Sequence, residues 1–190
     1  MAGRSFLVGV ACVSVIGTAA FAQEQESTNR VAAITDWSVF AESYASDGST
    51  TEASADGAIM ECWAVSAPKE SVNTRDGRVV AVRRGDILLF ATFRPTADVS
   101  GEIAFTGGYP FAEGSTVSLE IDDATFELFT EGEWAWPASA SDDIKIATAM
   151  KRGTLAVLTG RSSRGTVTKD SFSLLGFTAA LENAEERCAG

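Results

Sequence analysis

Short runs in which apolar and polar residues alternate constrain this chain more than any other feature. The clearest two lie at residues 116–121 (TVSLEI) and 124–129 (ATFELF), separated by Asp122-Asp123. Alternation with a period of two places the apolar side chains on one face of a β-strand. Two polar residues between such runs favour a tight hairpin, although Asp-Asp is a weaker turn signal than Asp-Gly. This part of the chain is therefore predicted to be an antiparallel hairpin.

Other runs suited to β-strands follow one another along the chain. Residues 86–93 carry apolar side chains on both faces of a strand, which predicts a central position in a sheet. Many short strands and no linker between two cores favour a single mainly β domain. We expect an antiparallel β-sandwich, with a small β-barrel as the alternative. The further strands are expected at residues 36–40, 59–65, 78–83, 99–105, 154–159 and 166–174.

One internal helix is well marked. Ser139 or Ser141 can cap it, and acids at positions 142 and 143 lie in its first turn, where negative charge complements the helix dipole. Its buried side is expected to comprise Ile146, Ala149 and Met150. Gly153 is a common kind of residue just past a helix end. The pattern therefore predicts a helix that ends before residue 153.

The N-terminal region resembles an export signal. Arg4 is the single charge before an apolar run at residues 6–20, and Ala20-Phe21-Ala22 is a small-x-small cleavage site. The run is shorter than the roughly 20 residues that a membrane-spanning helix needs. We therefore expect a signal peptide over residues 1–22, cut after Ala22. The product is expected in the periplasm or the medium, with no membrane span.

The remaining chain is expected to hold one folded unit. Residues 23–34 are polar and predict a flexible N-terminal segment, and residues 35–190 are long enough for one domain with a core. Within the domain, residues 43–57 are rich in Ser, Thr, Gly and acids and predict an exposed loop. Residues 67–78 carry Pro and charges and predict a connection.

The charge balance limits the partners. The chain has 26 Asp and Glu against 15 Lys and Arg, a net charge of −11. Such a field disfavours nucleic acid and anionic membrane surfaces. We expect an unidentified protein or envelope component as the partner, and no nucleic acid.

Two cysteines, Cys62 and Cys188, lie outside the expected signal peptide. In an exported chain, two such thiols predict one disulfide. A C-terminal helix is expected over about residues 178–187, and its apolar face turns Cys188 toward the body of the domain. That face is formed by Phe177, Leu181, Ala184 and Cys188.

The absence of histidine removes much catalytic chemistry. With no His in the chain, a Ser-His-Asp triad, a Cys-His pair and a His-ligated zinc are all excluded. We expect no catalytic residues, no metal site and no cofactor. The favoured function is that of a non-enzymatic interaction protein of the periplasm or envelope. The alternative is a carboxylate-dependent hydrolase, or a binding module, that acts on envelope polysaccharide, and a pair such as Glu61 and Asp86 could serve the hydrolase.

A basic loop offers a possible anion site. Arg161, Arg164 and Gly165 could cradle an anion with two guanidinium groups and exposed backbone amides. The alternative is a polar hairpin loop whose arginines pair with surface acids.

Aromatic residues offer a possible ligand-stacking site. Tyr109, Trp134 and Trp136 could form a platform for a sugar, and the two tryptophans, two positions apart, point to the same side of a strand. The alternative is that they anchor the core or its loops.

The tripeptide Arg84-Gly85-Asp86 is one that some animal cell-surface receptors recognise, so host-cell adhesion is one hypothesis. A turn between two strands is the other, because Gly85 permits the backbone conformations that turns need.

The chain carries five distinctive longer stretches, at residues 73–86, 105–110, 127–139, 149–153 and 160–177. Taken together, they resemble the invasion-associated locus B family of exported alphaproteobacterial proteins. The resemblance runs from about residue 35 to 188, although the insert at residues 43–57 departs from it. It implies an exported, disulfide-containing, mainly β protein, and it supplies no catalytic residues. The family name comes from a role in bacterial entry into host red cells, which the resemblance alone does not transfer to this chain.

Overall fold

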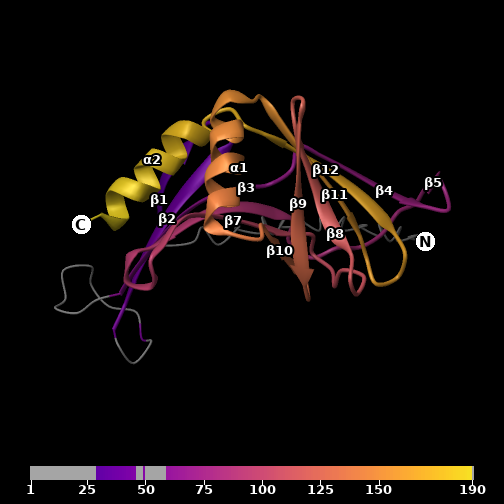
Figure 1. Cartoon of the computed structure of the whole chain (residues 1–190), viewed down its shortest axis with the longest axis horizontal. Coiled ribbons are helices and arrows are strands. Elements are labelled where there is room, and N and C mark those ends of the chain that lie inside the picture. The colour runs from indigo at the N-terminus through magenta and orange to yellow at the C-terminus, as the bar shows by residue number, and fades with distance from the viewer. Residues whose placement is uncertain (1–28, 46–48, 50–58, 190) are drawn as a thin grey trace, which may run out of the picture.

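All the strands that the structure describes join one antiparallel sheet (Figure 1). The computed structural model describes residues 29–45, 49 and 59–189. The sheet order is β1-β2-β3-β6-β7-β10-β9-β8-β11-β12-β4-β5. The strands are β1 Arg30–Ile34, β2 Trp37–Tyr44, β3 Ile59–Ser66, β4 Glu70–Arg75, β5 Arg78–Val79, β6 Leu88–Arg94, β7 Val99–Thr106, β8 Thr116–Ile121, β9 Ala124–Glu131, β10 Trp134–Trp136, β11 Leu155–Arg161 and β12 Val167–Ser173. The mainly β class is confirmed.

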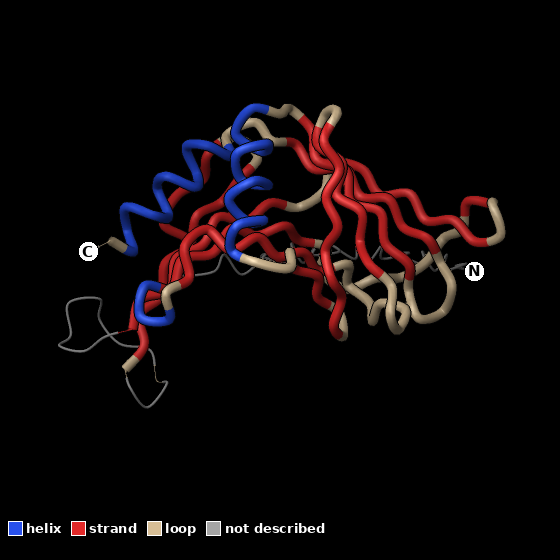
Figure 2. Tube along the Cα trace, viewed as in Figure 1, coloured by secondary structure: helices blue, strands red, loops and turns tan. Residues whose placement is uncertain are grey.

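The sheet bends so that its two halves meet around the core. Phe105 of β7 packs edge-on against Phe172 of β12, with ring centroids 6.1 Å apart. Trp37 of β2 donates its indole N–H to the carbonyl of Ser173 at 3.0 Å. These contacts join strands that are distant in the sheet order. In Figure 2 the helices lie together toward one end of the molecule, and β8, β9, β11 and β12 fan out toward the other.

The strongest local predictions are confirmed. The hairpin β8–β9 pairs Ile121 with Ala124 across the two-residue turn, where Asp122 has a left-handed φ of 49°. Strand β6 lies between β3 and β7, the central position that its two apolar faces predicted.

The internal helix α1 spans Ala140–Arg152 and ends at Gly153, as predicted. Its buried side chains are Ile146 and Met150. Asp143 has a second role, because its carboxylate accepts the backbone N–H of Ile103 at 2.8 Å. The pairing of β6 with β7 shifts register next to Ile103. Burial raises the pKa of Asp143, and the hydrogen bond from Ile103 opposes the rise.

The C-terminal helix α2 spans Phe177–Cys188 and covers β1, β2 and β3. The four residues predicted for its inner face are all buried. Cys188 forms the predicted disulfide with Cys62 of β3, with a Cα–Cα distance of 5.8 Å. The tail of the domain is thereby fixed covalently to a strand near its beginning. Neither α1 nor α2, within the described residues, has the length and apolarity of a membrane-crossing helix.

Some segments are more regular than predicted. Residues 30–34, expected within a flexible N-terminal segment, form β1, because they pair with β2 and pack against α2. Residues 70–75, expected as part of a connection, form β4, which pairs with β12. Ser43, expected to open an exposed loop, is buried in β2 opposite Met60 of β3. These predictions were wrong because each segment pairs its backbone with another strand, which its own residue pattern does not show. The partner is the next strand along the chain for β1 and for Ser43 of β2, and the distant β12 for β4.

One expected strand is shorter in the structure, and some predictions concern residues that the structure does not describe. The strand expected over residues 78–83 is limited to Arg78–Val79, and residues 80–87 run without regular structure to β6. The expected signal peptide, its cut after Ala22 and most of the loop at residues 46–57 lie outside the described residues.

Candidate anion-binding pocket and aromatic groove

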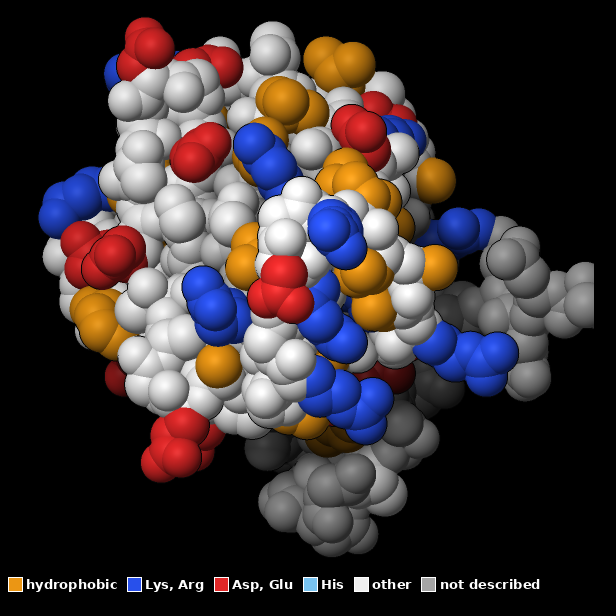
Figure 3. All heavy atoms as spheres, turned by 90° about the vertical axis from the view of Figure 1, so that its right-hand side faces the viewer, with side chains coloured by type: hydrophobic (Ala, Val, Ile, Leu, Met, Phe, Trp, Pro, Cys, Tyr) orange, Lys and Arg blue, Asp and Glu red, His pale blue; other side chains and the backbone are white. Residues whose placement is uncertain are grey.

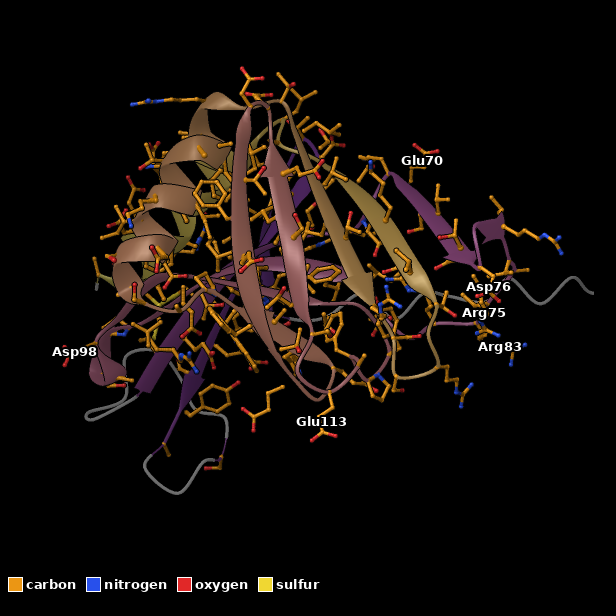
Figure 4. All side chains as sticks on the ribbon, turned by 45° about the vertical axis from the view of Figure 1, so that its right-hand side comes forward. Glu70, Arg75, Asp76, Arg83, Asp98 and Glu113 are labelled. Atoms are coloured by element: carbon orange, nitrogen blue, oxygen red, sulfur yellow. A yellow bond between two sulfur atoms is a disulfide. The ribbon has the colours of Figure 1, made fainter. Side chains whose placement is uncertain are left out.

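A pocket of about 410 Å³ at the β4–β5 end of the molecule gathers arginine side chains. Arg75 comes from the end of β4, Arg83 and Arg84 from the irregular segment before β6, and Arg164 from the β11–β12 turn. Figure 3 looks onto this end and shows Lys and Arg side chains gathered there. Figure 4 shows Arg75 and Arg83 lying close together at this end. Glu133 is the one acid among the described residues that line this arginine pocket.

Arg84 is a structural residue of the pocket wall. Its guanidinium makes a two-pronged ion pair with Asp170 of β12, at 2.6 and 2.7 Å. The two side chains are 6% and 0% exposed. Ser71 also donates to Asp170 at 2.7 Å, and the Arg84 Nε–H donates to the carbonyl of Gly107 at 2.8 Å. The bonds to Asp170 and Gly107 fix the irregular segment to β12 and to the residue after β7. They also leave the Arg84 guanidinium unavailable to an adhesion receptor.

The other three arginines keep their charge available. Within the described residues, no acidic side chain forms an ion pair with Arg75, Arg83 or Arg164. Arg75 donates instead to the hydroxyl of Thr166 at 2.6 Å. All three side chains belong to exposed residues. The arginine pocket is therefore positively charged at the surface of an acidic protein.

Tyr109 forms part of the floor of this pocket. The Arg84 guanidinium carbon lies 5.0 Å from the centre of its ring, in cation–π geometry. Its hydroxyl is 2.6 Å from that of Thr168. Burial raises the pKa of Tyr109, so its hydroxyl stays protonated at neutral pH. Tyr109 is thus a neutral hydrogen-bonding group beside the arginines.

Of the three residues predicted to bind an anion, two lie at the arginine pocket and one lies outside it. Arg164 lines the pocket, and Gly165 lies beside it in the turn with a φ of +80°. Arg161 is exposed and is not among the pocket-lining residues. Sequence reasoning missed Arg75 and Arg83 because they lie far from residue 164 in the chain. The available signal was the concentration of basic residues between positions 69 and 84.

The pocket wall depends on a close backbone approach at Gly108. The Gly85 N–H donates to the Gly108 carbonyl at 2.9 Å, and a Cβ built on Gly108 would lie 2.6 Å from the Gly85 carbonyl oxygen. Gly114 has the same φ of +69° but nothing within 4 Å of its Cβ position.

Gly108→Ala is therefore expected to cost more stability than Gly114→Ala. Both changes carry the left-handed cost of about 1–2 kcal/mol, and only Gly108→Ala adds the collision with Gly85. Urea unfolding of the two variants measures the difference. Equal midpoints would show that the contact at Gly85 imposes no constraint.

A second hollow, the aromatic groove, lies across β3, β6, β7 and β10 and has a volume of about 500 Å³. Trp134 and Trp136 lie in it together, with ring centroids 6.2 Å apart and planes 18° apart. The Phe90 ring lies 5.6 Å from that of Trp134. The two tryptophans are thus on one side of a strand, as expected, whereas Tyr109 belongs to the arginine pocket. The described lining residues are Glu61, Trp63, Phe90, Thr92, Arg94, Glu102, Ala104, Trp134 and Trp136.

Charged groups occupy one side of this groove. Arg94 Nη2 donates to a Glu102 carboxylate oxygen at 2.6 Å. Its Nε lies 3.9 Å from the Glu61 carboxylate and is a buried nitrogen with no hydrogen-bond partner among the described residues. Asp86, named with Glu61 as a possible catalytic pair in the sequence, is not among the groove-lining residues.

The chain belongs to the invasion associated locus B (IalB) family, whose family model matches residues 37–185. The match covers most of the described domain and confirms the family that the sequence motifs indicated. No curated protein and no solved structure matches the chain. Within the described residues, no three His, Cys, Asp or Glu side chains come together as a metal site.

Proposed function

We propose that this chain is an exported, non-enzymatic binding protein of the cell envelope, which holds an anionic group of its partner in the arginine pocket. The observation that carries the proposal is the set of three arginines, Arg75, Arg83 and Arg164, without an acidic partner among the described residues. Acids outnumber bases 26 to 15 in this chain. A group of unpaired cations in such a protein is unusual, because acids are abundant enough to pair with them.

The pocket offers the donors that an anion needs. Guanidinium groups bind phosphate, sulfate and carboxylate oxygens through paired N–H donors. Hydroxyls of Ser163, Thr166 and Tyr109 lie among them. Like charges held close together repel, and a bound anion removes that repulsion. The fixed Arg84–Asp170 pair carries no net charge, so it shapes the wall without cancelling the field of the other arginines.

A hydrolase is the second candidate, because the aromatic groove holds two carboxylates, Glu61 and Glu102. Arg94 already binds Glu102 and lies beside Glu61. That arrangement suits a fixed charge network better than a group that must deliver a proton. Release of soluble fragments from purified peptidoglycan, abolished by Glu61→Gln, would favour the hydrolase over the binding protein.

The binding proposal is tested by calorimetric titration of the chain from residue 23 onward with sodium pyrophosphate. We expect binding that weakens as salt is added and falls by about tenfold or more in Arg83→Ala/Arg164→Ala, because each charged hydrogen bond contributes about 1.5–3 kcal/mol. Arg161→Ala is the matched control and is expected to bind like the unaltered protein. Unchanged affinity in the double variant, or no NMR shift at Gly165 on titration, would contradict the proposal.

A further inference from the structure

The outer face of the first half of the sheet carries a row of aromatic side chains. Alternation along β3 turns Cys62 into the core and Trp63 to the opposite face. Phe40 of β2 stacks on Trp63, with ring centroids 5.5 Å apart and planes 5° apart. Phe90 and the two groove tryptophans continue the same face across β6 and β10. The aromatic groove is part of this face.

Trp134 and Trp136 form a stacked pair, the tryptophan platform, that lines the groove and lies outside the core. Trp134 is 39% exposed, in contrast to the core residue Trp37 at 1%. The two indoles lie nearly parallel, from positions two apart on the short strand β10. A large aromatic surface left open to solvent in a hollow is a feature of binding sites. One face of a pyranose ring presents C–H groups and packs flat on such a surface.

The polar groups beside the platform match the edge of a sugar. Glu61 and Glu102 can accept hydrogen bonds, Arg94 can donate, and the Thr92 hydroxyl can do both. Within the part of the chain that the structure describes, the Arg94 Nε has no hydrogen-bond partner, and a small movement of the guanidinium or of Glu61 would expose it to a ligand oxygen. A purely apolar partner segment would remove water from these charged groups without offering them a further hydrogen bond, which is costly. Two carboxylates also repel an anionic ligand.

We propose that the aromatic groove binds a carbohydrate chain of neutral or amino sugars, with a ring packed against the tryptophan pair and hydroxyls bonded to Glu61, Arg94 and Glu102. This site is separate from the arginine pocket, because the two share no lining residue. It also takes a ligand of different charge, so each site can be tested without the other.

The test is an NMR titration with two neutral probes, chitohexaose and cellohexaose. We expect at least one of them to shift the indole N–H signals of Trp134 and Trp136 and to leave that of Trp37 in place. Trp37 is an internal control that requires no variant, because it is buried in the core. If neither probe moves the two groove signals, the proposal is overturned.

Variants locate the binding. Trp136→Ala is expected to weaken binding of the sugar that shifts the groove signals, measured by calorimetry, by about tenfold or more. Loss of an aromatic side chain that stacks on a nucleic-acid base has an effect of this size. Glu102→Gln is expected to weaken it without removing the platform. Ile144→Ala removes an exposed apolar side chain on α1, which does not line the groove, and serves as the control. Arg83→Ala/Arg164→Ala is expected to keep full carbohydrate affinity even if it loses pyrophosphate. Equal affinity in Trp136→Ala and the unaltered protein would overturn the proposal.

Discussion

Replacing Cys62 and Cys188 together by alanine is expected to lower the free energy of unfolding by about 4–5 kcal/mol in the chain-entropy model. The two residues are 126 positions apart, so their bond closes a loop that holds most of the domain. Opening that loop increases the freedom of the unfolded chain. Domains of this size are stabilised by about 5–15 kcal/mol, so a loss of this size would leave the fold marginal.

Denaturant unfolding with and without dithiothreitol measures the effect. The unaltered protein is expected to lose stability when the reductant is added, and Cys62→Ala/Cys188→Ala is expected to be insensitive to it. The double variant is preferable to a single one, because a lone Cys188 thiol would be left beside the carbonyl of Phe93 in the core. Similar midpoints for the oxidised protein and the double variant would mean that the bond adds no stability.

The disulfide and the hairpin could be predicted because a few identifiable residues determine each of them. Two cysteines outside the expected signal peptide leave one pairing, and the inner face of α2 orients one partner toward the core. The hairpin β8–β9 is specified by alternation on both sides of a two-residue turn. In each case the deciding residues are neighbours in the sequence or are the only ones of their kind in the expected mature chain.

The arginine pocket could not be predicted, because it depends on the pairing of distant strands. Thr74 of β4 lies opposite Val167 of β12, and this register brings Arg75 and the β11–β12 turn to the same end of the sheet. Strand β4 reads ESVNTR, with one apolar residue, so its sequence gives little reason to expect a strand. Its place in the sheet follows from the backbone ladder and from Ser71, which bonds to Asp170.

Of the three aromatic residues singled out in the sequence, only the two tryptophans could be placed together from local strand geometry. Trp134 and Trp136 are two residues apart, so their common face follows from strand geometry. Tyr109 follows Gly108, whose positive φ redirects the chain after β7 toward β12. A sequence pattern shows that the chain turns there but not to which side, so it could not show that Tyr109 lines the arginine pocket while the tryptophans line the groove.

Replacing Arg84 by alanine is expected to lower the free energy of unfolding by about 3–5 kcal/mol, the usual cost of removing one partner of a buried ion pair. The change leaves Asp170, which is 0% exposed, as a buried carboxylate with Ser71 as its one remaining hydrogen-bond donor among the described residues. It also removes the bond from Arg84 to the Gly107 carbonyl. Urea unfolding of Arg84→Ala beside the unaltered protein measures the loss.

A surface pair provides the matched control. Lys145 and Asp142 on α1 lie 2.8 Å apart, with 64% and 35% of their side chains exposed. Lys145→Ala is expected to cost far less stability than Arg84→Ala, since solvent already screens that pair. A similar small cost for Arg84→Ala would show that water reaches Asp170 and that burial does not set the strength of the pair.

Replacing both partners of the ion pair distinguishes the cost of a buried unpaired charge from the cost of the other lost hydrogen bonds. Arg84→Met/Asp170→Leu leaves no buried charge and keeps side-chain volume, so it is expected to recover most of the stability that Arg84→Ala loses. Asn73 and the Gly107 carbonyl would still lose their bonds to Arg84. Recovery of stability with weaker pyrophosphate binding would therefore mean that Arg84 serves to position residues 80–87, and with them Arg83, at the pocket. If stability is not recovered, these lost hydrogen bonds matter more to the fold than the buried charge.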